Sequence, residues 1–187
     1  MKFPAALAAF AASAVVLLAC GGGNPTAPSG TANGVQTAAT FTTTVLSFTS
    51  DPRDFVGQGE SRAYTLQNAV FQPGVGRSGR QVSLGVRPNN EPPQSTWALL
   101  IIAPVGQQVA PGSYDTTNFG SSTTWALDFN GNGHGCQVAS GHLVIHSIEF
   151  GPDLLTLKHF RASFENHCEN RSPALRGEVT VLADPWR

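Results

Sequence analysis

The chain has 187 residues, which is enough for one globular domain with accessory segments. Charged residues make up 12% of the sequence and the formal net charge is −1. That charged fraction is about half the usual share of roughly 25%. So weakly charged a chain has no electrostatic attraction to nucleic acid or to an anionic membrane surface, and we predict no nucleic-acid partner.

The N-terminus has the composition of an export signal. Met1 and Lys2 give a short positive start, and an apolar run from Phe3 to Leu18 follows it. The run falls short of the roughly 20 residues that a spanning helix needs, so a cleaved signal peptide is favoured over an uncleaved transmembrane helix. We therefore predict a signal peptide over residues 1–19.

The sequence Leu17-Leu18-Ala19-Cys20 resembles the bacterial lipoprotein box. The resemblance implies cleavage before Cys20 and acylation of its sulfur and its amine. Several acyl chains, each buried CH₂ contributing about 0.8 kcal/mol, hold a protein on a membrane without a spanning helix. Gly21 follows the cysteine, and in Gram-negative lipoproteins this favours the outer membrane. The expected location is the cell envelope, after export, through a lipid anchor.

Residues 20–40 carry the lipidated cysteine and a linker rich in Gly, Pro, Thr, Ser and Ala, without a charged residue. Such a segment cannot bury enough apolar surface to offset the entropy of ordering. We expect a flexible tether that holds the following domain, residues 41–187, away from the bilayer.

Residues 41–187 alternate between β-branched or aromatic stretches and Gly/Pro/Asn breaks, without a sustained helical period. The pattern predicts an all-β domain, a single antiparallel β-sandwich or jelly roll of about eight to ten strands. The expected strands cover 41–48, 62–71, 81–86, 96–102, 112–114, 123–129, 136–150, 154–167 and 175–183.

Details of the pattern make finer predictions. In 123–129, alternation places Trp125, Leu127 and Phe129 on one face. In 154–167, the apolar residues change parity, which predicts a β-bulge near Lys158. Ser140-Gly141 predicts a break within 136–150.

Several sequence segments resemble those of an uncharacterised family of secreted bacterial β-domains. They span most of the domain, and the resemblance implies the fold and supports the pairing of the cysteines, but implies no activity. The segments are Ser50–Gly59, Trp97 to Tyr114, Gly133–Cys136, Phe164–Glu169 and Pro173–Gly177.

Once Cys20 is lipidated, Cys136 and Cys168 remain. A pair of cysteines in an exported protein predicts a disulfide, with a catalytic or metal-ligating cysteine as the alternative. His167 precedes Cys168, but neighbours in a strand point to opposite faces, which disfavours a thiolate–imidazole pair.

Calcium is the one metal that the sequence indicates. Asp51 and Asp54 flank Pro52, and the carbonyls near Gly57 and Gly59 are free to turn inward, so the turn is a candidate calcium site. The alternative is a capped turn in which Asp51 binds its own backbone. A second calcium-like run begins at Asp128, but its twelfth position is not acidic, which favours a hairpin turn.

The sequence contains no nucleophile elbow, phosphate-binding glycine loop or evident acid pair. We therefore interpret the chain as a non-enzymatic lipoprotein that binds a glycan, an envelope component or a protein. Two alternatives remain open. One is a hydrolase or lyase accessory that acts on polysaccharide, and the other is a purely structural envelope protein.

Overall fold

The computed structural model describes residues 43–76, 78–92, 95–117, 123–169 and 173–182. Ten strands occur there and belong to one sheet, so the predicted all-β class and strand number are confirmed. No helix in these ranges is long and apolar enough to cross a membrane. The predicted signal peptide, Cys20 and the linker lie outside the described residues. The strands are β1 (Val45–Ser50), β2 (Ser61–Thr65), β3 (Ala69–Gly76), β4 (Gln81–Pro88), β5 (Trp97–Ile102), β6 (Gly112–Thr117), β7 (Trp125–Gly131), β8 (Ala139–Phe150), β9 (Leu157–Cys168) and β10 (Leu175–Leu182).

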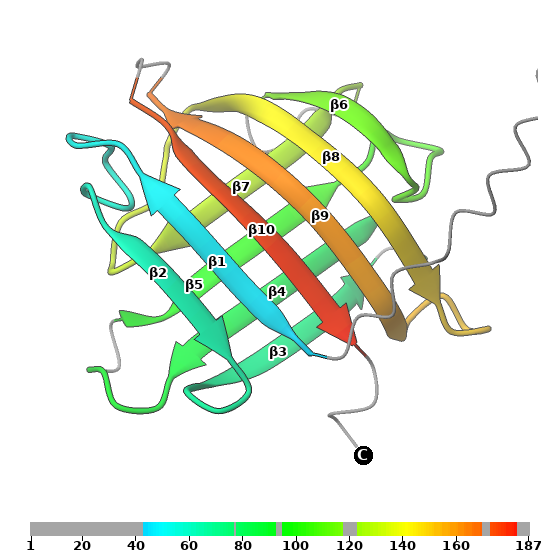
Figure 1. Cartoon of the computed structure of the whole chain (residues 1–187). Helices are drawn as coiled ribbons and strands as arrows, with labels where there is room; N and C mark the ends of the chain where they lie inside the picture. Colours follow the sequence, from blue (N-terminus) through cyan, green and yellow to red (C-terminus); the bar gives the residue numbers. More distant parts are fainter. Residues whose placement is uncertain (1–42, 77, 93–94, 118–122, 170–172, 183–187) are drawn as a thin grey trace, which may run out of the picture. The chain divides into compact units, whose positions relative to one another are not determined.

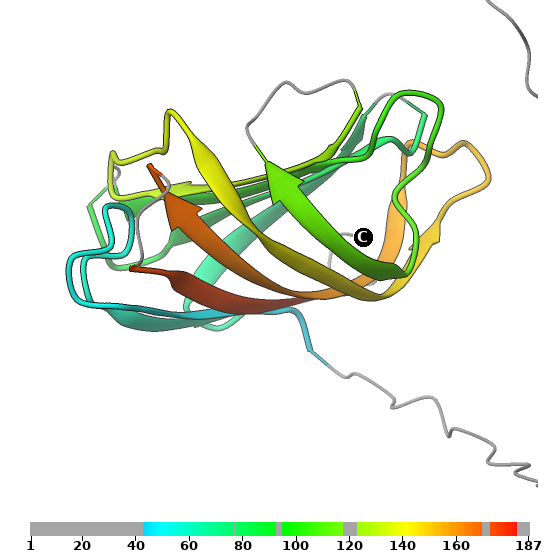
Figure 2. The ribbon, with the colours of Figure 1, turned by 90° about the horizontal axis from the view of Figure 1, so that it is seen from above.

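The sheet folds over into two layers whose strands cross (Figures 1 and 2). Along the sheet the order is β2-β1-β10-β9-β8-β6-β7-β5-β4-β3. We call the first six strands of this order the front layer and the last four the rear layer. The front layer thus holds β2, β1, β10, β9, β8 and β6, and the rear layer holds β7, β5, β4 and β3. One continuous sheet thus forms both layers, where two separate sheets would form a sandwich, and the core lies between the layers.

The two edge strands, β2 and β3, follow each other in the chain but lie at opposite ends of the strand order. Side chains join the layers at this seam. The Trp97 indole N–H on β5 donates to the Tyr64 hydroxyl on β2 at 2.8 Å, in a buried position. Arg62 of β2 pairs with Glu91, which lies between β4 and β5, at 3.2 Å. These contacts leave the sheet nearly closed.

At the other side of the fold, β6 and β7 meet through a short parallel pairing of Thr116 with Trp125 and Thr117 with Ala126. The other neighbouring strands pair antiparallel. The structure therefore differs from the predicted antiparallel arrangement at this one pairing. Because β6 meets β7 only at its last two residues, the sheet can pass there from the front layer to the rear layer.

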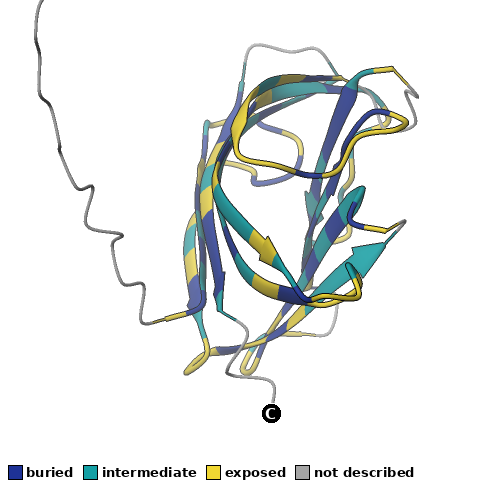
Figure 3. Cartoon of the chain, turned by 90° about the vertical axis from the view of Figure 1, so that its right-hand side faces the viewer, coloured by how far each residue is buried: buried dark blue, intermediate teal, exposed yellow. Residues whose placement is uncertain are grey.

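The core consists of buried residues from both layers, which Figure 3 colours dark blue. Near its centre, Phe48 of β1 contacts Trp97 and Phe129 of the rear layer, with ring centroids 4.5 and 5.3 Å apart. Phe129 also contacts Phe164 of β9 at 5.2 Å. Burying one such side chain contributes about 1.5–3 kcal/mol. The predicted inward face of β7 is confirmed, since its buried residues include Trp125, Leu127 and Phe129.

The pairing of β8 with β9 is interrupted twice, at His146 and at Lys158, which fall between consecutive register pairs. The bulge predicted near Lys158 is thus confirmed. The break predicted at Ser140-Gly141 is wrong, since both residues pair with β9. Gly141 is needed there because an added Cβ would overlap the Glu165 carbonyl oxygen. Bulges increase local twist and so help the front layer to curve.

The strand predicted over 62–71 is wrong, since the structure has two strands there, β2 and β3. A turn around Gln67 separates them. In it the Asn68 side chain accepts the Thr65 N–H at 2.7 Å and donates to the Ala63 carbonyl at 3.1 Å. An asparagine that satisfies backbone groups in this way favours a turn, and here it outweighs the strand propensity of its neighbours.

Candidate functional site

The front layer presents a polar face outward. In β9 the residues alternate, with Phe160, Ala162 and Phe164 buried and every residue between them polar. Because successive side chains of a strand point to opposite faces, these polar groups line the outer surface. The outward residues of β9 are His159, Arg161, Ser163, Glu165 and His167.

A depression of about 860 Å³ lies across β1, β2, β8, β9 and β10. The depression exists because some outward residues of these strands have small side chains, whereas the neighbouring residues have longer ones. Four lining residues carry hydroxyl groups. The Arg62 guanidinium pairs with Glu60 and Glu91 at the seam, so Arg176 is the arginine that the depression presents outward. The small outward residues are Ser47, Thr49, Ser61, Ala63 and Ser163. The ionisable ones are Arg62, His142, Glu165, Arg176 and Glu178.

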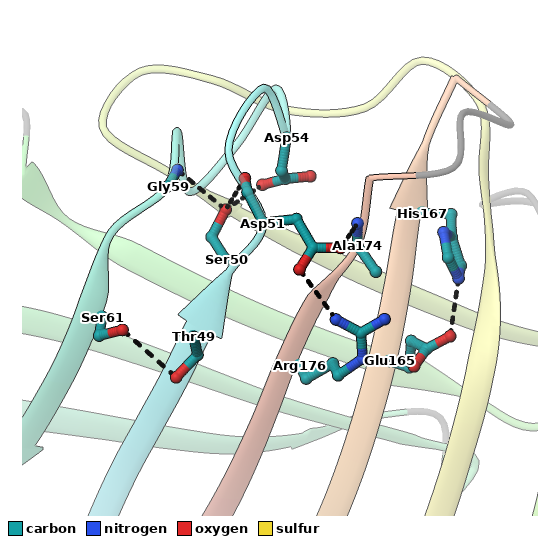
Figure 4. A network of polar contacts seen from close by, with 10 residues as sticks. All are labelled: Thr49, Ser50, Asp51, Asp54, Gly59, Ser61, Glu165, His167, Ala174 and Arg176. Atoms are coloured by element: carbon teal, nitrogen blue, oxygen red, sulfur yellow. Dashed lines mark hydrogen bonds and ion pairs between the residues drawn. The ribbon is translucent and has the colours of Figure 1, made fainter.

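Two of these lining residues, Glu165 and Arg176, belong to a network of ion pairs and hydrogen bonds (Figure 4). Arg176 donates from Nε to Glu165 Oε2 at 2.8 Å and from Nη1 to Asp51 Oδ1 at 3.1 Å. His167 Nε2 lies 2.7 Å from Glu165 Oε1. The sheet dictates these neighbours, since Arg176 is the register partner of Glu165 and His167 lies two residues further along β9.

The contacts of this network shift the pKa values of its members. The pKa of Asp51 is lowered, first by the N–H of Ala174 and then by the Arg176 guanidinium. The pKa of Glu165 is lowered by the hydrogen bond from His167 and by Arg176. The pKa of the Arg176 guanidinium is raised, mainly by Glu165. Exposed ion pairs contribute only about 0–1 kcal/mol each, so the network mainly fixes the orientation of Arg176 beside the depression.

The turn over 51–59, which supplies Asp51, is held together by Asp54 (Figure 4). Asp54 is buried, and its Oδ2 accepts the Gly57 N–H at 2.6 Å and the Ser50 hydroxyl at 3.0 Å. Gly57 has no space for a side chain, because an added Cβ would overlap Ser50. The turn is therefore built around one buried carboxylate.

The predicted calcium ligands, Asp51 and Asp54, thus lie in one turn but accept hydrogen bonds from different partners. A cation between them would compete with Arg176 for Asp51 and with the Gly57 N–H for Asp54. Among the described residues, no group of three or more His, Cys, Asp and Glu side chains is arranged to hold a metal ion. The turn is capped, but by Asp54 and not by Asp51 as predicted, because the Asp51 carboxylate binds the Ala174 N–H and Arg176 instead. The calcium site stays a prediction.

Cys136 and Cys168 lie at disulfide distance, with Cα atoms 5.2 Å apart, as predicted. Cys168 ends β9 in the front layer, whereas Cys136 belongs to the connection that leaves β7 of the rear layer. Beside the pair, Glu169 accepts the backbone N–H of Gln137 at 2.9 Å. The pair therefore ties the β7–β8 connection to the front layer.

A smaller depression of about 440 Å³ lies beside the rear layer and the β7–β8 connection. Asp128 and Asn130 line it, and Asn130 Nδ2 donates to Asp128 Oδ2 at 3.1 Å. Burial raises the pKa of Asp128. The following Asn132 and Gly133 have φ values of 52° and 74°, as in a type I′ hairpin turn. The predicted tight turn is present and closes with a bridge between Gly131 and His134, but it joins no hairpin, because β6 lies between β7 and β8 in the sheet.

Sequence reasoning missed Arg176, Glu165 and His142 as candidate site residues. The sequence of β9 could have indicated Glu165, because polar residues alternate there with apolar ones and so mark the outward face of the strand. The partners could not be assigned, since Glu165 meets Arg176 only through the pairing of β9 with β10.

Comparisons with known proteins identify no relative. No family model matches the chain, and searches of curated proteins and of solved structures found no match. The resemblance to secreted bacterial β-domains stays a prediction. A function therefore has to be argued from the site.

Proposed function

We propose that the chain is a lipid-anchored binding module of the cell envelope and that it binds its ligand in the depression on the outer face of the front layer. The observation that carries this proposal is the composition of the depression, which joins hydroxyl groups with a pre-oriented arginine. Polar groups that are already held in position lose less conformational freedom on binding.

The lining favours a glycan as the ligand. Its outward charged groups are Arg176, Glu165 and Glu178, because Arg62 pairs with Glu60 and Glu91 at the seam, so the lining has no excess of positive charge that would favour an anionic ligand. Hydroxyl, carboxylate and guanidinium groups together donate and accept hydrogen bonds, as a neutral polymer rich in hydroxyl groups requires. The aromatic lining residues, Phe48 and Phe164, are buried in the core, so recognition proceeds through hydrogen bonds rather than ring stacking.

Attachment to the membrane rests on the lipoprotein box that ends at Cys20. An acylated Cys20 and the linker that follows it would place the β-domain at the membrane surface, with the outer membrane as the favoured site. We expect metabolic labelling with palmitate to mark the wild type. Cys20→Ala should abolish the label and release or mislocalise the protein, and unchanged labelling of the variant would contradict the anchor.

Binding is tested with purified full-length protein on an array of bacterial envelope polysaccharides. Ala63→Trp places a bulky side chain in the depression at an exposed position of β2, and we expect it to weaken binding by at least about 10-fold. The matched control is Gln72→Trp, because Gln72 is also exposed on an edge strand, β3, but belongs to the rear layer. Equal binding of both variants would refute the proposed site.

The same experiment separates the alternatives. Recovery of an envelope protein that depends on the residue at position 63 would replace the glycan by a protein partner at the same surface. Absence of binding to any polysaccharide or envelope protein would favour the structural envelope protein. The hydrolase alternative is supported by a different feature, which lies at the border of the depression.

A further inference from the structure

Three polar side chains on the outer face of the front layer form a hydrogen-bonded series. Ser113 and Asp115 stand two residues apart on β6, and both are exposed. His142 on β8 is the register partner of Asp115. Its Nε2 lies 2.8 Å from Ser113 Oγ, and its Nδ1 lies 3.1 Å from Asp115 Oδ1. The series is therefore serine–imidazole–carboxylate, with each ring nitrogen assigned to one partner.

This arrangement defines the tautomer that general-base chemistry needs. A carboxylate beside Nδ1 accepts the N–H there, which leaves the lone pair of Nε2 directed at the serine hydroxyl. His142 can then take the proton of Ser113 while Asp115 holds the ring. Nucleophilic triads are identified by this geometry and not by the order of their residues along the chain.

A second serine–histidine pair on the same face lacks the acid. His146 Nε2 lies 3.1 Å from Ser163 Oγ, and no described residue places a carboxylate on its other nitrogen. Of the histidines in these two pairs, His142 is therefore the one with both partners. The two pairs provide a comparison within one surface.

The series also borders the depression. His142 and Val144 of β8 line it, and Ser113 is the register partner of Val144 on the adjacent strand. A polymer bound across β1, β10 and β9 and continuing over β8 would reach the Ser113 hydroxyl. The serine is thus positioned beside, and not inside, the proposed glycan site.

We propose that Ser113 is a nucleophile for acyl transfer, with His142 as its general base and Asp115 as a positioning residue. The substrate class is an O-acyl ester carried by the hydroxyl-rich ligand of the depression, so this choice of substrate rests on the proposed function. Ser113 Oγ attacks the acyl carbonyl and transfers its proton to His142 Nε2. The ester C–O bond breaks, and the leaving alkoxide takes that proton. Water then hydrolyses the acyl-serine, so the products are an acid and an alcohol.

The first test is covalent labelling of full-length protein with a fluorophosphonate probe, followed by mapping of the modified residue. In this reaction the Ser113 oxygen displaces fluoride from phosphorus, and its proton passes to His142. We expect the label on Ser113 and none on Ser163. Ser113→Ala should lose the label, and His142→Gln should slow labelling by about 100-fold. Ser147→Ala, which changes another outward serine of the front layer, serves as the control.

The role of Asp115 is tested by exchanging its carboxylate. Its side chain is 97% exposed, so water screens its charge and its effect should be smaller than that of His142. We expect Asp115→Asn to slow labelling by about 10-fold and Asp115→Glu to restore part of the rate, which a merely structural role would not predict.

Hydrolysis of p-nitrophenyl acetate gives a second readout of the complete cycle. We expect turnover by the wild type and its loss in Ser113→Ala, with unchanged melting temperatures. The inference is overturned if folded wild type is not labelled on Ser113, or if Ser113→Ala hydrolyses the ester at the wild-type rate through its histidines alone. Neither assay needs a glycan. Failure of both with intact polysaccharide binding would refute the triad and leave the binding module standing.

Discussion

The strands of the two layers differ in the number of charged residues, although both layers bury an apolar inner face. In the rear strands the charged residues are Arg87 and Asp128. The front strands hold eight, four of each sign, together with four histidines. The eight are Arg62, Asp115, Glu149, Lys158, Arg161, Glu165, Arg176 and Glu178.

The difference shows which surface features folding does not require. The rear layer pairs its strands and buries Trp97 and Phe129 with few charges on its outer face. Its outward groups on β5, Ala98 and Leu100, are small or apolar and half-buried. The arginine–carboxylate network and the serine–histidine contacts of the front layer are therefore additions to the fold, and that is why we assign the function to the front layer.

The largest predicted effect comes from separating the layers at the cysteine pair. Closing a loop between residues 32 apart contributes about 3–4 kcal/mol in the chain-entropy treatment. Cys136→Ala with Cys168→Ala should lower the free energy of unfolding by about this amount, measured by urea denaturation. Denatured but unreduced mature protein should show no reactive thiol, and two thiols would contradict the pairing.

The second contact between the layers is the hydrogen bond from Trp97 to Tyr64 across the seam. Trp97→Phe and Tyr64→Phe each leave a buried polar partner unsatisfied, which costs about 1–3 kcal/mol. The double variant removes both polar groups, so its loss should be smaller than the sum by about 1 kcal/mol. Strictly additive losses in urea unfolding would show that the bond does not couple the layers.

The turn over 51–59 has a smaller effect and decides between a cap and a calcium site. Asp54→Ala leaves the Gly57 N–H and the Ser50 hydroxyl without their acceptor, and we expect a loss of about 1–2 kcal/mol in EDTA. An unchanged melting temperature would contradict the cap.

The same melting experiment tests calcium. Calcium at 100 times its Kd would add about 2.7 kcal/mol to the wild type, and Asp51→Asn with Asp54→Asn would erase that gain. Identical curves in millimolar calcium and in EDTA would leave Asp54 as a cap alone.

The local sequence pattern was enough to predict the fold class, most of the strands and several details of the fold. Period-2 alternation placed Trp125, Leu127 and Phe129 in the core, and a change of parity located the bulge at Lys158. The pattern failed at Asn68, where one side chain bound two backbone groups and divided a predicted strand. Such a turn depends on hydrogen bonds between a side chain and the backbone, which strand propensities of single residues do not describe.

The candidate site was less predictable because it depends on strand order. Arg176 meets Glu165 through the β9–β10 register, and Arg176 meets Asp51 across 125 positions of the chain. Asp115 and His142 become neighbours only when β6 pairs with β8. The spacing of residues along the chain does not reveal these contacts. The two cysteines could be paired from the sequence, because only two remain once Cys20 is lipidated.

The pH dependence of stability should have one sign for the front-layer network. The folded-state pKa values of Asp51 and Glu165 lie below their ordinary values of 3.8 and 4.5. The unfolded chain therefore binds more protons in this range, and stability rises with pH. Their contribution is complete above about pH 4.5 and is lost as the pH falls through the folded values. Asp51→Asn with Glu165→Gln should flatten the decline of unfolding free energy from pH 5 to pH 3, measured in urea.

The rear layer should show the opposite sign at Asp128. Burial raises the pKa of this carboxyl above its ordinary value of 3.8, so the folded chain binds the proton more tightly than the unfolded chain does. Its contribution is therefore most favourable below that value and is lost as the pH rises through the folded pKa. Asp128→Asn keeps a polar side chain beside Asn130 and removes the buried charge. We expect the variant to gain stability relative to the wild type as the pH rises from 3 to 7, while the front-layer double variant loses it. A change of the same sign in both would contradict the electrostatic difference between the two faces.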